Sequence, residues 1–214
     1  MCYTLIWVAP QKFIIAFVPL REVEGRKLFL LSQNKNKEDN MKTQSFNEIE
    51  NLTKEYSMIP ICKEIYADVI TPIQLLRKME AFDKNFFLLE SVEGGEKWAR
   101  YSFLGYEPVL HITCKNGKVT QKSGEIEHTV TVDPMDALRQ LLHKYKSPKI
   151  EGMPTFTGGF VGDFGYEMIG YAEPKLNIKD SEFDDYNLML FDKVIVYDHL
   201  KQKIMVIANM KSKD

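Results

Sequence analysis

The sequence predicts an α+β fold, mainly an antiparallel β-sandwich with flanking helices. Short segments of apolar or alternating residues recur along the chain and are separated by tight-turn signals, of which Asn116-Gly117 is the strongest. Two helix starts are marked by a capping residue followed by proline, at Thr71-Pro72 and Asp133-Pro134. Short strands joined by tight turns favour antiparallel sheets with a few helices outside them, not a doubly wound parallel sheet.

The first half of the chain is expected to contain two helices. Apolar residues at helical spacing predict a short helix over residues 46–52, and the helix that starts at Thr71-Pro72 is expected to run to about Phe82. Alternating or continuous apolar residues predict the strands of this half. They are expected over residues 59–66, 86–89 and 98–106, the last as one strand or as a pair of strands broken near Ser102.

The second half of the chain is richer in strand signals. The helix that starts at Asp133-Pro134 is expected to end near Tyr145 and to cover a sheet. Asp198-His199 is expected to be a turn within a final hairpin that is rich in β-branched residues. The strands of this half are expected over residues 109–114, 118–121, 126–132, 188–197 and 203–208.

A glycine-rich segment lies at residues 158–167. It lacks the Gly-Lys-Ser/Thr of a phosphate-binding loop and does not match a dinucleotide fingerprint, so a phosphate cradle is not expected. We interpret the segment as a strand whose missing side chains let another backbone approach closely. Asp163 within it is expected at a sheet edge or facing solvent.

Composition excludes several classes of partner and site. The net charge of −2 gives no electrostatic basis for binding nucleic acid or an anionic membrane. The three cysteines form no CxxC pair and fit reduced thiols in the cytoplasm. The four histidines are widely spaced, so no metal site is predicted.

The first forty residues do not fit the rest of the chain. Residues 5–20 are apolar but interrupted by Pro10-Gln11-Lys12, which makes them too short and too broken to span a membrane. A polar linker follows at residues 32–40. We expect residues 1–40 to be a disordered or non-native extension, with Met41 as the natural start of a domain over residues 41–214; a membrane-associating tail is the alternative.

The strand at residues 86–89 ends in two polar residues, Glu90 and Ser91. A carboxylate and a hydroxyl at the end of a buried strand need polar partners, and a ligand ammonium would suit Glu90. Alternatively, Glu90 faces water or caps the turn that follows. Arg100 either pairs through its guanidinium fork with a carboxylate, on a ligand or on Glu90, or is a surface arginine on an alternating strand.

Five ordered motifs resemble the N-terminal region of anthranilate synthase component I, of the chorismate-utilising enzyme family. The resemblance begins at about Met41 and continues to the last residue, and five matches in order are more specific than any single short motif. The matching segments are Ile59-Pro60-Ile61, Asp68-Val69-Ile70-Thr71-Pro72, Leu88-Leu89-Glu90-Ser91, Arg100-Tyr101-Ser102-Phe103-Leu104-Gly105 and the glycine-rich segment at residues 158–167.

The resemblance implies a regulatory role for the Leu-Leu-Glu-Ser segment, which is similar to the tryptophan-binding motif of the family. It assigns Glu90 to the ammonium of L-tryptophan, Ser91 to polar contacts and Leu89 to an apolar wall of the inhibitor site. Arg100 is a further polar support. In the intact enzyme, the resemblance implies conversion of chorismate and ammonia to anthranilate and pyruvate, with Mg²⁺ as cofactor and a glutamine amidotransferase subunit, component II, as partner.

The resemblance also implies that the catalytic part is missing. The family's chorismate-binding domain comes mostly from sequence C-terminal to this region, so the chain alone is expected to have no catalytic residues, no cofactor and no activity. Two other interpretations stay open. One is the corresponding region of aminodeoxychorismate synthase component I or an isochorismate-type synthase. The other is a stand-alone binding module.

Overall fold

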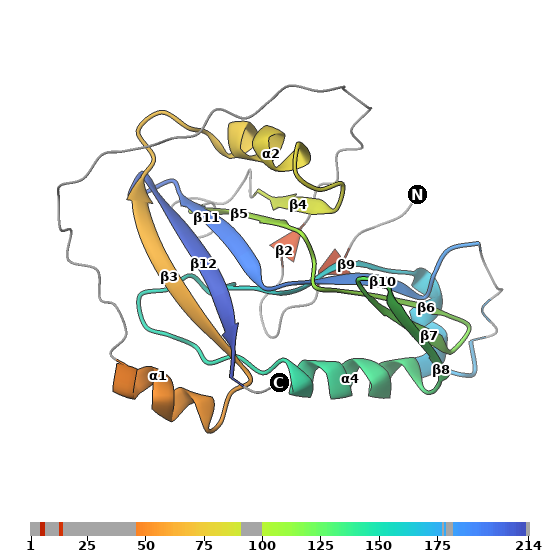
Figure 1. Ribbon diagram of the computed structural model, residues 1–214. Coiled ribbons are helices and arrows are strands. Elements are labelled where there is room, and N and C mark those ends of the chain that lie inside the picture. The colour runs from red at the N-terminus through yellow and green to blue at the C-terminus, as the bar shows by residue number, and fades with distance from the viewer. Residues whose placement is uncertain are drawn as a thin grey trace.

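The computed structural model describes residues 5–6, 13–14, 46–90, 100–176, 178 and 182–212. Within these ranges the chain forms two five-stranded antiparallel sheets with a few helices outside them (Figure 1). The predicted α+β class is therefore confirmed. Strands β1 (Leu5–Ile6) and β2 (Phe13–Ile14) form a separate antiparallel pair. The rest of residues 1–40 lies outside the described residues, so the expected boundary at Met41 stays a prediction.

The first sheet has the strand order β3-β12-β11-β5-β4. Its apolar inner face includes Phe87, whose ring centroid lies 4.8 Å from that of Phe191 of the second sheet. Val161 of the second sheet joins this cluster, so the core lies where the two sheets meet. The strands are β3 (Met58–Tyr66), β12 (Lys203–Lys211), β11 (Lys193–Asp198), β5 (Tyr101–Tyr106) and β4 (Phe86–Leu89).

The second sheet has the strand order β8-β7-β6-β10-β9. Helix α4 (Pro134–Lys144) covers one of its faces by packing Ala137, Leu138 and Leu141 onto it, as predicted for that helix. The strands are β8 (Ile126–Thr131), β7 (Lys118–Ser123), β6 (Leu110–Lys115), β10 (Tyr186–Phe191) and β9 (Gly159–Phe164). The short helices η1 (Tyr166–Met168) and α5 (Ile169–Ala172) follow β9.

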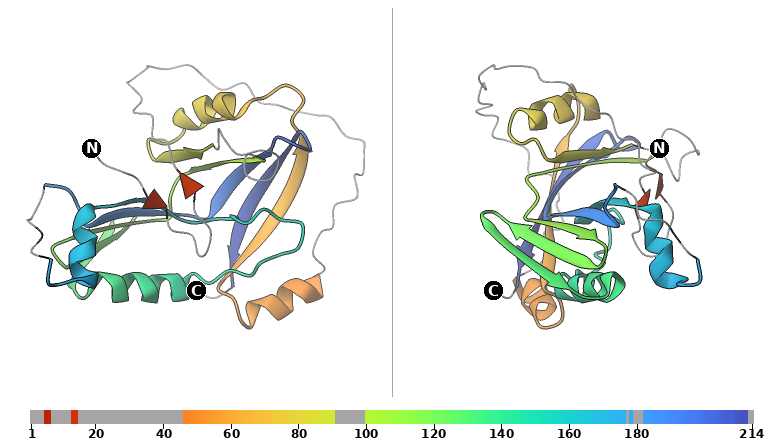
Figure 2. Two further views of the ribbon diagram at one scale, coloured as in Figure 1. Left: turned by 180° about the vertical axis from the view of Figure 1, so that it is seen from behind. Right: turned by 90° about the vertical axis from the view of Figure 1, so that its right-hand side faces the viewer.

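Helices α1 and α2 contact strands of the first sheet. Helix α1 (Phe46–Thr53) precedes β3, and α2 (Pro72–Glu80) packs against β4 and β5. Figure 2 shows α2 on one side of the molecule and α1 and α4 on the opposite side. The predicted capping residues are confirmed: the Thr71 hydroxyl accepts the Gln74 N–H at 3.3 Å, and the Asp133 carboxylate accepts the Met135 N–H at 2.9 Å.

The structure corrects the strand predicted over residues 188–197. Asp192 divides it into β10 of the second sheet and β11 of the first. The physical reason is a change of face: Leu190 packs into the cluster under α4, whereas Val194, which would share its face in one continuous strand, packs into the core between the sheets. Residues of one face therefore change from one cluster to the other between Leu190 and Val194, where the chain passes from one sheet to the other.

Three other local predictions can be compared with the structure. Asn116 and Gly117 have φ angles of 51° and 73°, as a tight hairpin between β6 and β7 requires, which confirms the turn. Of the two alternatives for residues 98–106, the described residues show a single strand, because β5 runs unbroken through Ser102. Residues 98 and 99 lie outside the described residues. Asp163 lies on the edge strand β9 and is half-buried; burial, together with the charge of Asp184, raises the pKa of its carboxyl group.

Gly162 lets β9 approach β10 closely. A Cβ atom at this position would lie 2.0 Å from the Asn187 carbonyl oxygen and 2.9 Å from the Leu188 Cα. Both are backbone atoms of the paired strand, so a side chain could be accommodated only by separating the strands. The interpretation of the glycine-rich segment as a strand with a close backbone neighbour is therefore confirmed.

Replacing Gly162 by alanine is expected to lower the free energy of unfolding by about 2 kcal/mol, because overpacking against backbone cannot be relieved by a side-chain rotation. Gly170→Ala is the matched control, since a Cβ there meets no atom closer than 3.7 Å. Urea denaturation of both variants measures the difference. Equal unfolding free energies for the two variants would show that the β9–β10 contact is not tight.

Candidate functional site

The candidate site lies where β4 ends and β5 begins. Leu89 is the last residue of β4, pairs with Phe103 of β5, and packs against the core between the sheets. Glu90 follows directly and is half-buried. Ser91 lies outside the described residues, so its predicted role remains untested. The strand end with its carboxylate is thus present as the sequence indicated.

Glu90 is hydrogen-bonded to the neighbouring strand. The Ser102 hydroxyl of β5 donates to Glu90 Oε1 at 3.3 Å, and the same hydroxyl oxygen lies 2.7 Å from His199 Nε2. Ser102 is completely buried, with 0% of its surface exposed. The carboxylate therefore does not simply face water: one of its oxygens is held by a buried hydroxyl, which in turn contacts an imidazole.

Arg100 pairs with Asp198, not with Glu90. Its Nε lies 3.1 Å and 3.2 Å from the two carboxylate oxygens, and a terminal nitrogen lies 2.7 Å from Asp198 Oδ2. The expected guanidinium fork is confirmed, but its carboxylate is a third residue that was not considered. Arg100 thus fixes the turn beside the candidate site.

Asp198 is almost fully buried, with 2% of its surface exposed. Burial by itself would raise the pKa of its carboxyl group. The hydrogen bonds from Arg100 and from the Lys201 and Leu200 backbone N–H groups outweigh this effect, so the pKa is lowered. The carboxylate is therefore ionised at neutral pH, and it holds both Arg100 and the turn that follows β11.

The turn between β11 and β12 is built around His199. Its backbone N–H donates to the Arg100 carbonyl oxygen at 2.8 Å, and its own carbonyl oxygen accepts the Gln202 side-chain amide at 2.7 Å. The ring lies beside that of Tyr197, with centroids 4.7 Å apart. These contacts present the imidazole to Ser102 in a defined orientation.

Sequence reasoning missed Ser102, Asp198 and His199 as members of the site. The turn predicted at Asp198-His199 begins at His199, directly after Asp198 ends β11, and an aspartate that opens a turn commonly accepts backbone N–H groups. No local signal, however, places this turn beside β4. The contact between Arg100 and Asp198 joins positions 98 residues apart.

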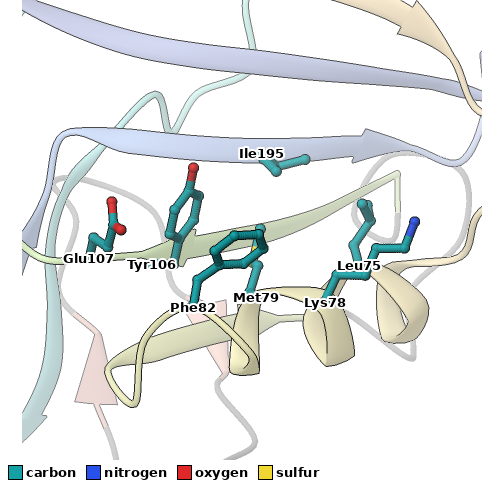
Figure 3. Close-up of a pocket in the computed structure, with 7 residues that line it drawn as sticks. All are labelled: Leu75, Lys78, Met79, Phe82, Tyr106, Glu107 and Ile195. Atoms are coloured by element: carbon teal, nitrogen blue, oxygen red, sulfur yellow. The ribbon is translucent and has the colours of Figure 1, made fainter. Parts of the chain in front are cut away.

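A separate cavity lies at the other end of β5, between α2 and the first sheet (Figure 3). It has a volume of about 350 Å³, and it contains none of the predicted site residues. Its walls are mainly apolar, and Glu107 at its rim is paired with Lys193 at 2.7 Å. The lining residues are Leu75, Lys78, Met79, Phe82, Tyr106, Glu107 and Ile195.

We place the candidate site at Glu90 and not in this cavity, because Glu90 offers a half-buried carboxylate whose neighbours hold it in position. Such a group can accept a cationic ligand. Among the described residues, no three His, Cys, Asp or Glu side chains are grouped so that they could hold a metal ion. The helices in the described part of the chain are all too short or too polar to cross a membrane.

Comparisons with known proteins gave no matching family model but several curated relatives. A protein from Acetivibrio thermocellus named anthranilate synthase component 1 is 38% identical over 169 residues, which is 78% of this chain and 34% of the relative. Relatives of the same name from Acinetobacter calcoaceticus and Pseudomonas aeruginosa are 34% and 37% identical, covering 76% and 72% of this chain and 34% and 32% of their own lengths.

Solved structures were also found to be similar. One of them is the crystal structure of anthranilate synthase component I from Streptococcus pneumoniae TIGR4, with 29% sequence identity and a TM-score of 0.45, covering 70% of this chain and 32% of that one. The chain spans about one third of the length of the curated relatives it matches.

Proposed function

Because this chain is related over about three quarters of its length to proteins named anthranilate synthase component 1, we propose that it is the tryptophan-sensing region of such an enzyme. Its role in the proposal is feedback inhibition, not catalysis. The observation that supports this role most directly is Glu90, a half-buried carboxylate at the end of β4 that Ser102 holds by a hydrogen bond.

The proposed ligand contacts follow from the chemistry of the strand end. The Glu90 carboxylate accepts the α-ammonium group of L-tryptophan in a charge-assisted hydrogen bond. Leu89 forms part of the apolar wall, and Ser91 adds polar contacts at the same end. Arg100 supports the site through Asp198 without contacting the ligand. Tryptophan inhibits by binding one arrangement of the protein more tightly than another.

We also propose the reaction of the whole enzyme of which this chain would be a part. It is the conversion of chorismate and ammonia to anthranilate and pyruvate, in a complex with a glutamine amidotransferase, component II. The proposal includes Mg²⁺, but the described residues offer no group of ligands for it, so we assign it no site on them. We also propose a cytoplasmic location, which is consistent with the free thiols of Cys62 and Cys114.

Thermal unfolding of the 214-residue chain with and without L-tryptophan tests the proposal. Ligand at about 100 times its Kd adds roughly 2.7 kcal/mol if it binds only the folded state, which corresponds to an increase in Tm of about 5–10 °C for a chain of this length. D-Tryptophan, L-phenylalanine and indole-3-propionate, which lacks the ammonium group, are the controls. A similar shift with indole-3-propionate would contradict the role of Glu90.

A further inference from the structure

We propose that Ser102 and His199 are positioning residues that fix the Glu90 carboxylate for its ligand. Together the three side chains form a relay from His199 through Ser102 to Glu90, with steps of 2.7 Å and 3.3 Å. This inference rests on the proposed function for the identity of the ligand. The relay itself is a property of the protein alone and can be tested without any ligand.

The direction of the relay follows from counting protons. An ionised carboxylate only accepts hydrogen bonds, so the single hydroxyl proton of Ser102 is directed at Glu90 Oε1. The Ser102 oxygen can then only accept from His199, which requires a proton on Nε2. The geometry therefore assigns His199 as an Nε2–H donor, whether its ring is neutral or protonated.

The relay has a consequence for the orientation of Glu90. The terminal torsion of a glutamate side chain has a broad, shallow energy profile, so an unrestrained carboxylate samples many orientations. Hydrogen bonding of Oε1 to a completely buried hydroxyl restricts this torsion. Among the described residues no side chain bonds the other oxygen, which can accept a cation. Less entropy is then lost when a ligand binds, and the gain is specific to ligands that carry a hydrogen-bonding cation.

His199 can hold the Ser102 hydroxyl in place because several hydrogen bonds fix the turn on which it lies. Its backbone N–H is bonded to the Arg100 carbonyl oxygen, and the Asp198 carboxylate accepts the backbone N–H groups of Leu200 and Lys201 at 3.0 Å each. The Arg100–Asp198 ion pair ties this turn to the start of β5. The imidazole thus approaches Ser102 from a turn anchored on both sides.

Nitrogen NMR of the free 214-residue chain tests the direction of the relay. We expect His199 to carry its proton on Nε2, and we expect the Nε2 resonance to move in Ser102→Ala, where the acceptor is removed. A neutral ring protonated only on Nδ1 would overturn the proposal, whether or not the chain binds tryptophan.

Four variants test the effect on binding of L-tryptophan by calorimetry. His199→Phe keeps a ring beside Tyr197 but removes the donor, and Ser102→Ala breaks the relay at its centre; each is expected to weaken binding about tenfold. His199→Gln, which restores an N–H donor, is expected to recover most of the affinity. The double variant His199→Phe with Ser102→Ala is expected to lose about tenfold, because the two residues act in series.

The outcomes separate the relay from the proposed function. Losses that multiply to about a hundredfold in the double variant, or no recovery with glutamine, would show two independent structural effects and overturn the positioning role. A chain that has the Nε2–H proton and responds to Ser102→Ala in the NMR experiment, yet does not bind tryptophan, would support the relay and overturn the ligand assignment.

Discussion

Replacing Arg100 by methionine is expected to lower the free energy of unfolding by about 3 kcal/mol, since removing one partner leaves the other charge buried and unpaired. Asp198 is 2% exposed, so its carboxylate cannot recover the lost interactions from water. The value is at the low end for buried pairs because 27% of the Arg100 side chain is exposed. Urea denaturation at neutral pH measures the change.

Arg139→Met is the matched control, because it removes the same kind of side chain from an ion pair with Asp136 that is 66% and 63% exposed. Exposed pairs contribute about 0–1 kcal/mol, so this variant is expected to be nearly as stable as the wild type. If the two variants lost the same free energy of unfolding, the buried Arg100–Asp198 pair would contribute no more than an exposed pair, and the prediction would be wrong.

The effect of Arg100→Met is also expected to depend on pH. The pKa of Asp198 is lowered in the folded protein, so the stability that its ionised form contributes is fully present above the unfolded-state pKa of about 4. This contribution is lost as the pH falls through the lower, folded-state pKa. The difference between wild type and variant should therefore narrow below about pH 4. A difference that stays constant down to pH 2 would exclude this linkage.

The features that could be predicted from the sequence are those set by neighbouring residues. Thr71 and Asp133 cap their helices through contacts to residues two or three positions along the chain. Asn116-Gly117 adopts the positive φ angles that its residue types favour. Such local chemistry can be read from one sequence, and it was sufficient to identify the α+β class and most of the strands.

Features that depend on the relation between sheets could not be predicted in the same way. Residues 188–197 look like one apolar strand, and only the tertiary structure shows that Leu190 and Val194 pack into different clusters and that the chain changes sheets at Asp192. The sequence alone also left open whether residues 98–106 form one strand or a pair broken near Ser102. Its hydroxyl is satisfied by Glu90 and His199, so β5 continues through it.

In the candidate site, too, features set by neighbouring residues could be predicted, whereas contacts between distant residues could not. Glu90 could be singled out because an acidic residue directly after an apolar strand is chemically unusual, but only the resemblance to a known family assigned it to a ligand. The partner of Arg100 could not, because Asp198 is distant in sequence and both suggested carboxylates, Glu90 and a ligand, were reasonable on charge alone. His199 was recognised only as part of a turn, and its contact with Ser102 depends on the pairing of β11 with β5.

Replacing Glu90 by glutamine is expected to weaken binding of L-tryptophan by about 3 kcal/mol, roughly a hundredfold in Kd, because it removes the charge that pairs with the ligand ammonium. The amide oxygen of glutamine can still accept the Ser102 hydroxyl, so the strand end should remain folded. The substitution thus separates the charge of Glu90 from its structural contact. It tests the ligand assignment more directly than truncation to alanine would.

Isothermal titration of L-tryptophan into the wild-type chain, Glu90→Gln and Glu107→Gln is the most direct test of the proposed sensor site. Glu107 provides the same change of charge at the rim of the cavity in Figure 3. We expect binding by the wild type, unchanged affinity in Glu107→Gln and a roughly hundredfold loss in Glu90→Gln. No binding by the wild type, or a loss in Glu107→Gln with none in Glu90→Gln, would contradict the assignment of the tryptophan site to the end of β4.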